Sequence, residues 1–295
     1  MTNIELYNYL KTSLSDLPFD SSERLVFARR LFSCITGAGQ QDMVVNPDRV
    51  LCFSAGYVDN ILERIRRSEP LEYVFNKAKF LDYEFFTNGN VLIPRPETEE
   101  LVMMVRDYIA EAGIRADVLD IGTGSGCIPV SLACMLPGCS FTAFDVSADA
   151  IVTARQNAGK YGCDVDFRLV DILEWRTADF LRVSCTKNDG LYDVIVSNPP
   201  YVMDSEKAEM RSNVLDYEPH NALFVPDGDP LVFYRCISGF AAEFLRPGGR
   251  LFFEINERLG KETATLMEDC GFCNVSIIKD LFSKDRFAVG IWPSS

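Results

Sequence analysis

Histidine is almost absent from this sequence: His220 is the single copy among 295 residues. Histidine is the usual general base of catalytic triads and the commonest metal ligand in proteins. Its scarcity argues against triads that use histidine and against most histidine-ligated metals. We therefore expect the chemistry of this protein to depend on other residue types.

Paired cysteines are also lacking. The ten cysteines are scattered along the chain, and the only close pair with two intervening residues is Cys270 and Cys273. No second pair or histidine cluster is present to complete a zinc site with them. We predict a protein without a metal ion, whose cysteines stay reduced as is typical of the cytoplasm.

Positive charge and long apolar runs are in short supply as well. The 43 acidic residues outnumber the 29 basic ones, giving a net charge of −14. Such a chain would repel a phosphate backbone, so we expect no direct nucleic-acid partner. No apolar run approaches the roughly 20 residues needed to cross a membrane, and residues 1–5 do not resemble a secretory signal. We expect a soluble, intracellular monomer with no membrane partner.

The first 75 residues carry apolar side chains at helical spacing. The clearest example, residues 22–35, follows the capping pattern Asp20-x-x-Glu23 and ends before Gly37. At 295 residues and 47% hydrophobic content, the chain is long enough for a small and a large domain. We assign residues 1–75 to a small helical domain.

Residues 76–97 form the predicted linker. Apolar segments at 80–86 and 91–93 flank Thr87-Asn88-Gly89-Asn90, and Asn-Gly between apolar runs is a strong signal for a β-hairpin. The hairpin leads into a segment with helical spacing whose first turn is acidic, which suits the helix dipole. We place the second domain at residues 98–295.

Strands and helices alternate from residue 116 onward. The predicted strands lie at residues 118–121, 141–145, 165–170, 192–196 and 250–255, the last after a turn at 247–249. Two further strands, near 275–278 and 286–291, have no helix between them, which indicates an antiparallel pair at the sheet edge. The pattern predicts an α/β, Rossmann-like fold with a mostly parallel sheet.

A glycine-rich turn follows the first of these strands. Asp120-Ile-Gly122-Thr-Gly124-Ser-Gly126 lets the backbone approach a ligand closely, but it lacks the dinucleotide spacing and the Gly-Lys-Ser/Thr of a phosphate loop. Asp145 ends the second strand where a ribose diol would bind. A nucleoside with an amino-acid tail meets this description, and the common cofactor of that kind is S-adenosylmethionine. We expect Asp171 to accept from its adenine amino group and Ile172 to pack on the ring.

The strand at 192–196 ends in Ser197-Asn198-Pro199-Pro200-Tyr201. Two prolines remove backbone donors and restrict the residue before them, so the corner is rigid and rich in acceptors. The Asn198 side-chain oxygen and the Pro199 carbonyl suit a planar NH₂ group beside Tyr201. A plain surface turn is the alternative interpretation, because Asn-Pro is a common turn opener.

Taken together, these motifs resemble a class I S-adenosylmethionine-dependent methyltransferase. With Ile93-Pro-Arg-Pro-Glu-Thr-Glu99, the helical N-terminal region and Tyr217-Glu218-Pro219, the whole chain resembles the peptide chain release factor glutamine methyltransferases. The resemblance implies a release factor as protein substrate, recognised in part by the N-terminal domain. It places the substrate amide on Asn198, Pro199, Pro200 and Tyr201. The cofactor site that it implies comprises Asp120, Gly122, Thr123, Gly124, Ser125, Gly126, Asp145, Asp171, Ile172 and Asn198.

Other functions stay open at this point. Related enzymes methylate a glutamine of a ribosomal protein, and enzymes that methylate the adenine amino group of nucleic acid use similar Asn/Asp-Pro-Pro-Tyr corners; a non-enzymatic cofactor sensor or scaffold is a further alternative. The chain also departs from the family where residues 73–80 lack a glycine and where Glu254-Ile-Asn256 replaces a frequent glycine. Structural roles are expected for the remaining candidates, Tyr217, Glu218, His220, Cys270 and Cys273.

Overall fold

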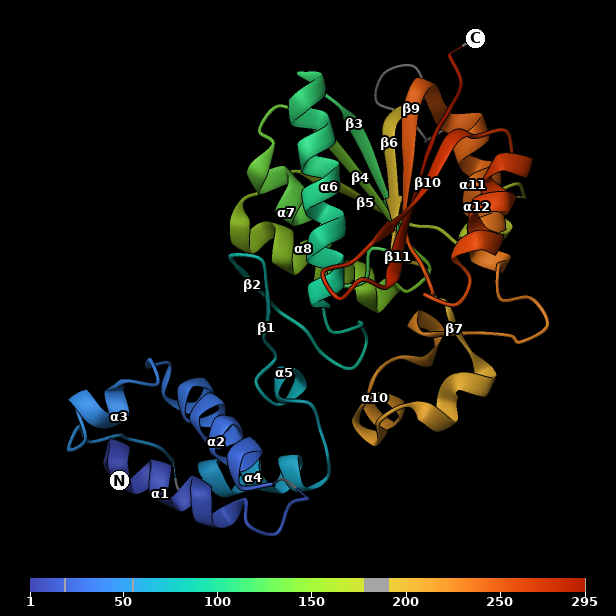
Figure 1. Cartoon of the computed structure of the whole chain (residues 1–295). Helices are drawn as coiled ribbons and strands as arrows, with labels where there is room; N and C mark the ends of the chain where they lie inside the picture. Colours follow the sequence, from blue (N-terminus) through green and yellow to red (C-terminus); the bar gives the residue numbers. More distant parts are fainter. Residues whose placement is uncertain (19, 55, 178–190, 295) are drawn as a thin grey trace. The chain divides into compact units, whose positions relative to one another are not determined.

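The computed structural model describes the chain except residues 19, 55, 178–190 and 295. The described chain forms two compact units, Met1–Asn76 and Lys77–Ser295. The smaller is helical and the larger contains the central sheet (Figure 1). Among the described helices, none combines the length and the hydrophobicity that a membrane-spanning helix requires.

The smaller unit has a hydrophobic core of its own, built from apolar residues of its helices, including Leu6, Leu10, Phe32 and Leu62. The predicted capping box is present, because the Asp20 side chain accepts from the backbone of Ser22 and Glu23. The helix then ends at Gly37, which adopts φ 67°. The helices are α1 (Asn3–Ser13), α2 (Ser21–Thr36), α3 (Asp42–Val45), α4 (Tyr57–Arg66) and α5 (Leu71–Val74).

The larger unit is organised around a seven-stranded sheet with the order β10-β11-β9-β6-β3-β4-β5. Strands β9, β6, β3, β4 and β5 are parallel neighbours, while β11 runs antiparallel to both β9 and β10. This confirms the predicted mostly parallel sheet with an antiparallel edge. The strands are β3 (Asp117–Ile121), β4 (Ser140–Asp145), β5 (Val165–Leu169), β6 (Tyr192–Ser197), β9 (Leu245–Glu254), β10 (Cys273–Lys279) and β11 (Asp285–Ile291).

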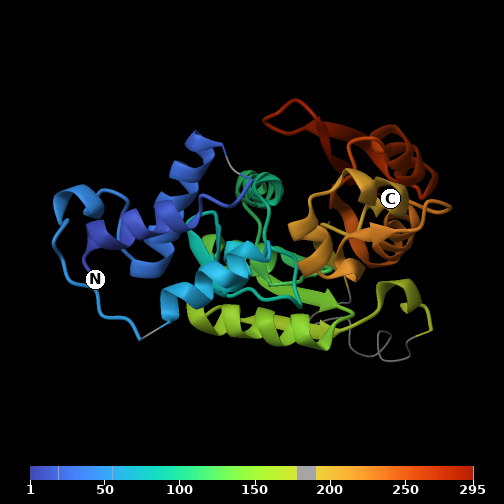
Figure 2. The same cartoon turned by 90° about the horizontal axis from the view of Figure 1, so that it is seen from below.

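Helices cover both faces of this sheet (Figures 1 and 2). Alternate strand residues point to opposite faces, so Val118 belongs to one core cluster and Leu119 to the other. The first face carries α6 (Pro96–Ala112), α7 (Cys127–Met135) and α8 (Ala148–Tyr161), and the second carries α11 (Val232–Phe244) and α12 (Gly260–Asp269).

A β-hairpin is present in this region, but the predicted position of its turn was wrong. Strands β1 (Ala78–Phe80) and β2 (Tyr83–Phe85) pair across Leu81 and Asp82, not across Asn88-Gly89. Residues 88–91 do form a turn, with the Val91 amide 3.1 Å from the Asn88 carbonyl, but no strand follows. The reason is tertiary, because the Ile93 amide donates to Glu218 and the Phe86 backbone bonds Asn157 on α8. The hairpin therefore belongs to the larger unit.

The turn predicted at residues 247–249 is also absent as a separate feature. Pro247-Gly248-Gly249 lies inside β9, where the register against β6 shifts. Gly248 adopts φ 82° and donates to the Trp292 carbonyl at 2.9 Å, so it continues the sheet instead of leaving it. A side chain at Gly249 would approach the Asp193 carbonyl to 3.0 Å, which explains the second glycine.

Short elements fill the chain between β6 and α11. They form a compact insertion at the carboxyl ends of the parallel strands (Figure 1). Within it, β7 pairs in parallel with β8 through Val202 and Phe224. The elements are β7 (Val202–Met203), η2 (Asp204–Glu209), α10 (Ser212–Tyr217), η3 (His220–Ala222) and β8 (Phe224–Val225); a further short helix, η1 (Ile172–Glu174), follows β5.

Candidate active site

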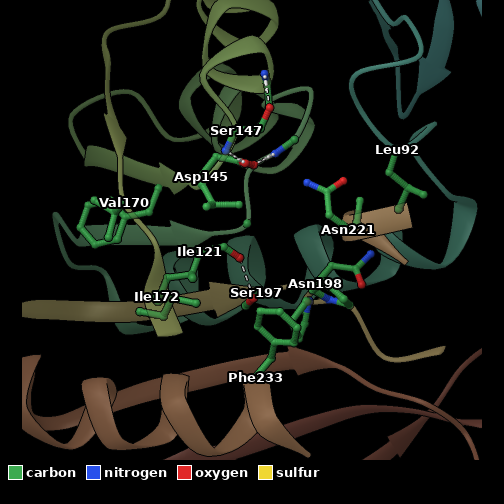
Figure 3. A pocket seen from close by; sticks show the side chains of 18 of the residues that line it. Leu92, Ile121, Asp145, Ser147, Val170, Ile172, Ser197, Asn198, Asn221 and Phe233 are labelled. Atoms are coloured by element: carbon green, nitrogen blue, oxygen red, sulfur yellow. Dashed lines mark hydrogen bonds between the residues drawn. The ribbon is translucent and has the colours of Figure 1, made fainter. Parts of the chain in front are cut away.

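A pocket opens at the carboxyl ends of β3, β4 and β6 (Figure 3). Strand order reverses between β3 and β6, and open α/β sheets bind ligands at such a switch point. The pocket encloses about 800 Å³ with its open mouth included, which is enough for a nucleoside with a tail. All of its lining residues belong to the larger unit.

The glycine turn forms the floor of the pocket between β3 and α7. Gly122, Gly124 and Gly126 all have positive φ, of 81°, 53° and 77°, where other residues are strained. A Cβ at Gly126 would lie 3.0 Å from the Cβ of Ala154 on α8, so this glycine also lets two helices pack closely. The sequence therefore needs glycine here for backbone geometry, as predicted.

Asp145 at the end of β4 braces this turn. Its carboxylate accepts from the Gly124 amide and from the Ser147 amide, both at 2.8 Å (Figure 3). Burial raises the pKa of Asp145, and these amide hydrogen bonds oppose that shift. A carboxylate has about four lone-pair sites, so two remain for the hydroxyls of a ribose.

Asp171 and Ile172 line the wall beyond β5. Asp171 caps η1, because one carboxylate oxygen accepts from the Leu173 amide at 2.9 Å. Its other oxygen stays available to a ligand such as an adenine amino group. Ile172 is buried with Val170 in the apolar part of this wall, which suits the face of a planar ring.

Asp120 has the most unusual surroundings of the acidic residues. It is 1% exposed, and neither carboxylate oxygen has a hydrogen-bond partner among the described residues. Burial, with a contribution from the charge of Asp145, raises the pKa of Asp120 to about 7, and the nearby Thr123 hydroxyl, although it forms no hydrogen bond with good geometry, opposes this shift. A buried polar group without a partner is costly, so a cationic group of a ligand nearby would be favoured.

The structure brings most, but not all, of the predicted residues to the pocket surface. Those that line it are Gly122, Gly124, Asp145, Asp171, Ile172, Asn198, Pro199 and Pro200. The remaining predicted residues lie behind this surface, namely Asp120, Thr123, Ser125, Gly126 and Tyr201. Tyr201 packs against the core cluster of α11 and α12, and so its predicted contact with a substrate amide has no counterpart in the pocket lining.

The Asn198 side chain is held by a buried polar network. Its amide nitrogen donates to the Thr98 hydroxyl at 3.0 Å, and Thr98 donates to Glu254 at 2.7 Å. The Tyr201 hydroxyl donates to the other Glu254 oxygen at 3.0 Å. Because its nitrogen is engaged with Thr98, Asn198 offers its oxygen to the pocket. Pro199, the next residue, lines the same pocket.

Several site residues were missed from the sequence. Thr98 and Glu254 lie 156 positions apart and meet only in the folded chain, so no local pattern could pair them. Asn221 and Phe233 also line the pocket and come from segments with no distinctive motif (Figure 3). Glu218 was expected to be structural, and it is buried in an ion pair with Arg95 at 2.6 Å. His220 bonds the Leu215 carbonyl and packs on Phe224, away from the pocket lining.

No candidate metal centre emerges from the described ranges, where no cluster of three or more His, Cys, Asp or Glu side chains could hold an ion. Cys270 and Cys273 are both free thiols.

Comparison with known proteins agrees with this geometry. Residues 103–217 match the family model of the methyltransferase small domain. The chain is 40% identical to a release factor glutamine methyltransferase of Bacteroides thetaiotaomicron, covering 94% of this chain and 96% of that protein. It is also 40% identical to one of Flavobacterium psychrophilum, with coverage of 91% and 92%. The chain belongs to the release factor glutamine methyltransferase family.

Family membership confirms the resemblance that the sequence motifs indicated. The fold is shared more widely: a 16S rRNA N2 G1207 methyltransferase of T. thermophilus, solved with AdoMet and guanosine, matches with a TM-score of 0.50 at 19% identity. That match covers 73% of this chain and 49% of the other. It supports the class I methyltransferase fold.

The pocket of this methyltransferase fits S-adenosylmethionine. Asp145 has acceptor capacity for a ribose, and Ile172 and Val170 supply an apolar wall for a base. The buried charge of Asp120, behind the glycine turn, would favour a cationic amino-acid tail in front of it. Positive φ at the glycines lets the backbone approach the ligand. The chemistry of these residues is therefore consistent with the predicted cofactor.

Proposed function

We propose that this chain transfers the methyl group of S-adenosylmethionine to the side-chain amide nitrogen of a glutamine in a peptide chain release factor. The observation that carries the proposal is the Asn198-Pro199 corner, which lines the pocket and whose asparagine nitrogen is engaged with Thr98, so that the acceptors of this corner are left for a substrate NH₂ group. The family of the chain supports the same substrate.

Asn198 and Pro199 would help to overcome the weak nucleophilicity of the substrate amide nitrogen. An amide nitrogen is a weak nucleophile because its lone pair is delocalised into the carbonyl. Hydrogen bonds from its two N–H groups to these acceptors would fix the nitrogen and raise its electron density. Pro200 adds rigidity, since the two prolines restrict the backbone of the corner. Orientation of this kind can supply several kcal/mol, on the order of 7–11 at best, toward the barrier.

The residues that would hold the cofactor are Asp145 at the ribose, Asp171 and Ile172 at the adenine, and Asp120 with the glycine turn at the amino-acid tail. When bound, S-adenosylmethionine supplies a methyl group already activated on a sulfonium. No strong base is needed, because the proton can leave the amide after transfer. This agrees with the described pocket lining, which contains no histidine.

Selection of the right glutamine requires more than this pocket. An amide site alone cannot distinguish one glutamine from another, so we assign recognition of the rest of the release factor to the helical unit Met1–Asn76. A narrow corner admits a side chain only if neighbouring backbone can come close, which favours a glycine-flanked loop as the target. We place this activity in the cytoplasm, where a release factor acts.

The decisive experiment incubates purified release factor with labelled cofactor and maps the product by tandem mass spectrometry. We expect one methyl group on a glutamine amide, and loss of most labelling with Asn198→Ala at nearly unchanged cofactor affinity. Parallel reactions contain ribosomal proteins, and nucleic acid with and without ribonuclease. A label found on adenine or on a ribosomal protein, and not on the release factor, would overturn the assignment in favour of that substrate.

A further inference from the structure

The network behind Asn198 contains a carboxylate that the proposed chemistry does not use. Glu254, at the end of β9, is 1% exposed and receives hydrogen bonds from Thr98 and Tyr201, one on each oxygen. Thr98 lies in the first turn of α6 and is 3% exposed. Burying an ionised carboxylate is costly unless it is hydrogen-bonded or paired, and through Thr98 these hydrogen bonds connect Glu254 to Asn198 at the pocket.

The direction of each hydrogen bond in this network follows from proton counting. A carboxylate only accepts, whereas a hydroxyl has one proton to donate. Thr98 directs that proton to Glu254, so it has only lone pairs left for Asn198. The Asn198 amide must then present its NH₂ end to Thr98. Its oxygen is consequently the end available to a ligand.

We propose that Glu254 and Thr98 are positioning residues that select this orientation of the Asn198 amide, and so determine that the substrate meets an acceptor. The inference rests on the proposed function, because it concerns a substrate NH₂ group. In the reversed orientation, the Asn198 NH₂ would face the NH₂ of the glutamine, and two donors form no hydrogen bond. Glu254 thus determines, through Thr98, whether Asn198 presents an acceptor or a donor to the substrate.

Charged and titratable groups on several elements face Glu254. Tyr201 follows β6, Tyr234 on α11 donates to the Glu254 backbone carbonyl at 3.3 Å, and Glu97 lies on α6. Arg286 on β11 is the nearby cation. The Arg286 side chain is 13% exposed, and its guanidinium pairs with Asp280 at 3.2 Å.

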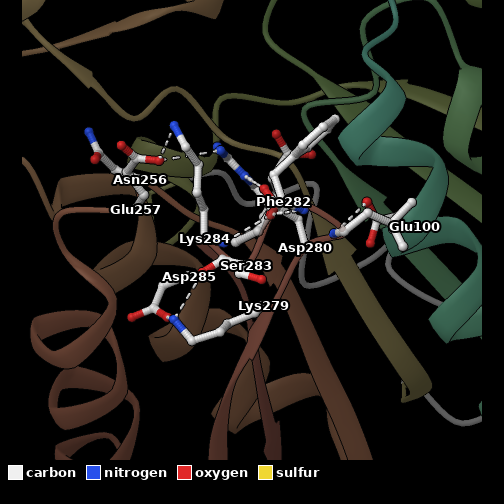
Figure 4. A network of polar contacts seen from close by, with 12 residues as sticks. Glu100, Asn256, Glu257, Lys279, Asp280, Phe282, Ser283, Lys284 and Asp285 are labelled. Atoms are coloured by element: carbon white, nitrogen blue, oxygen red, sulfur yellow. Dashed lines mark hydrogen bonds and ion pairs between the residues drawn. The ribbon is translucent and has the colours of Figure 1, made fainter.

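Arg286 is in turn fixed by the tip of the β10–β11 hairpin. Asp280 is buried and also accepts from the backbone of Phe282 and Lys284, while Glu257 lies on the other side of the arginine (Figure 4). These contacts keep the Arg286 guanidinium near Glu254. Burial raises the pKa of Glu254, whereas the hydrogen bonds from Thr98 and Tyr201 and the charge of Arg286 lower it.

A protonated Glu254 would be able to donate to Thr98. Thr98 would then be free to donate to the Asn198 oxygen, and the amide could reverse. The proposal therefore predicts that kcat falls as the pH drops through the pKa of Glu254. In Glu254→Gln this acid limb should be absent, because the variant side chain does not titrate.

The first test compares Thr98→Val with Thr98→Ser. Valine keeps the shape of threonine without its hydroxyl, and serine keeps the hydroxyl. We expect kcat to fall about 10- to 100-fold in Thr98→Val, the effect of one lost polar contact, and by less than about fivefold in Thr98→Ser. Thr263→Val, at a buried threonine of α12 outside the pocket lining, is the matched control and should keep wild-type kcat.

Cofactor affinity and thermal unfolding are measured for every variant, so that a folding defect is recognised. Glu254→Gln should lower kcat by a similar factor, with the dissociation constant of S-adenosylmethionine within about threefold of wild type. Wild-type kcat in Thr98→Val, equal losses in Thr98→Val and Thr98→Ser, or an acid limb that persists in Glu254→Gln would overturn the proposal. Failure of the wild-type enzyme to label release factor would instead count against the proposed function. The ratio of variant to wild-type kcat would then be measured with the substrate that is labelled.

Discussion

Asp120 and Asp145 end neighbouring parallel strands, yet their surroundings differ. Asp145 accepts two backbone hydrogen bonds, whereas Asp120 has no partner among the described residues. The first residue is therefore built into the turn, and the second is a buried charge directly behind the pocket surface. This contrast leads to separate expectations for affinity and for stability.

Replacing Asp145 by alanine should weaken cofactor binding. A charge-assisted hydrogen bond to a ribose is worth about 1.5–3 kcal/mol, which corresponds to roughly 10- to 150-fold in Kd. Isothermal titration calorimetry measures this change directly. Asp149→Ala removes the same charge four residues away, at an exposed position outside the pocket lining, and should leave Kd unchanged. An unaltered Kd in Asp145→Ala would show that the ribose contact is misplaced.

Asp120 should make the ligand-free enzyme less stable as the pH rises. Its pKa in the folded state, about 7, lies above the ordinary value of 3.8, so the folded state binds the proton more tightly than the unfolded state. The stabilisation is complete below pH 3.8 and is lost as the pH rises through 7. Between pH 5 and pH 8 the loss from this group amounts to roughly 2–3 kcal/mol.

Urea unfolding of the ligand-free wild type and of Asp120→Asn at both pH values tests this expectation. The asparagine variant should lack this part of the pH dependence, since its side chain does not titrate. Identical pH dependence in the two proteins would mean that Asp120 titrates normally. Saturating cofactor provides a second comparison, because a bound cation would favour the ionised Asp120 and reduce the difference.

At the scale of elements, two walls of the pocket come from a loop and from a short 3-10 helix. Asn90, Val91 and Leu92 follow the β1–β2 hairpin, and Asn221 and Ala222 belong to η3. Glu218 connects these segments, because it accepts from the Ile93 amide and pairs with Arg95. The two proline-containing motifs around residues 93–96 and 217–219 therefore form one structural unit.

Glu218→Ala should loosen both walls together. The Glu218 side chain is 1% exposed, and its removal would leave the Arg95 charge and the Ile93 amide without this partner. We expect a loss of roughly 2–3 kcal/mol in the free energy of unfolding, together with weaker cofactor binding. Denaturant unfolding and calorimetry provide the two measurements. The control is Glu63→Ala, which breaks an exposed pair with Arg67 and should cost at most about 0.5 kcal/mol. Equal losses in the two variants would contradict the structural role.

At the scale of the whole molecule, each unit has a hydrophobic core of its own. The helical unit is built around Leu6, Phe32 and Leu62, and the larger unit has a core on each face of its sheet. The complete pocket lies in the larger unit. Cofactor binding and recognition of the protein substrate are thus expected to be separable.

A fragment containing residues 77–295 should bind S-adenosylmethionine with a Kd within roughly threefold of the full chain. It should nevertheless methylate intact release factor poorly, because the helical unit is missing. The fragment starts at 77 and not at the predicted boundary of 98, since a shorter piece would lose the wall at residues 90–92. Calorimetry and turnover with the same preparation measure both properties. Full activity of the fragment on intact release factor would show that the helical unit does not select the substrate.

Local patterns in the sequence were sufficient for much of this protein. Glycine spacing after Asp120, acidic residues at strand ends and the rigid Asn198-Pro199-Pro200 corner depend on the backbone conformation of a few consecutive residues. The parallel sheet follows equally from alternating strands and helices. The capping box at Asp20 and Glu23 is local too. For these reasons the fold class, the family and a core set of the pocket-lining residues could be predicted before the structure was known.

The tertiary structure decided what depends on distant partners. Asn88-Gly89 is a good hairpin turn, but Glu218 and Asn157 engage the backbone on either side of it and leave no strand to pair. Tyr201 follows the Asn198-Pro199-Pro200 corner in sequence, but its hydroxyl donates to Glu254. Thr98 contacts Asn198 only because the start of α6 lies beside the carboxyl ends of β6 and β9. Such contacts join residues about 50 to 160 positions apart, and a hydrogen bond between them leaves no periodic signal in the sequence.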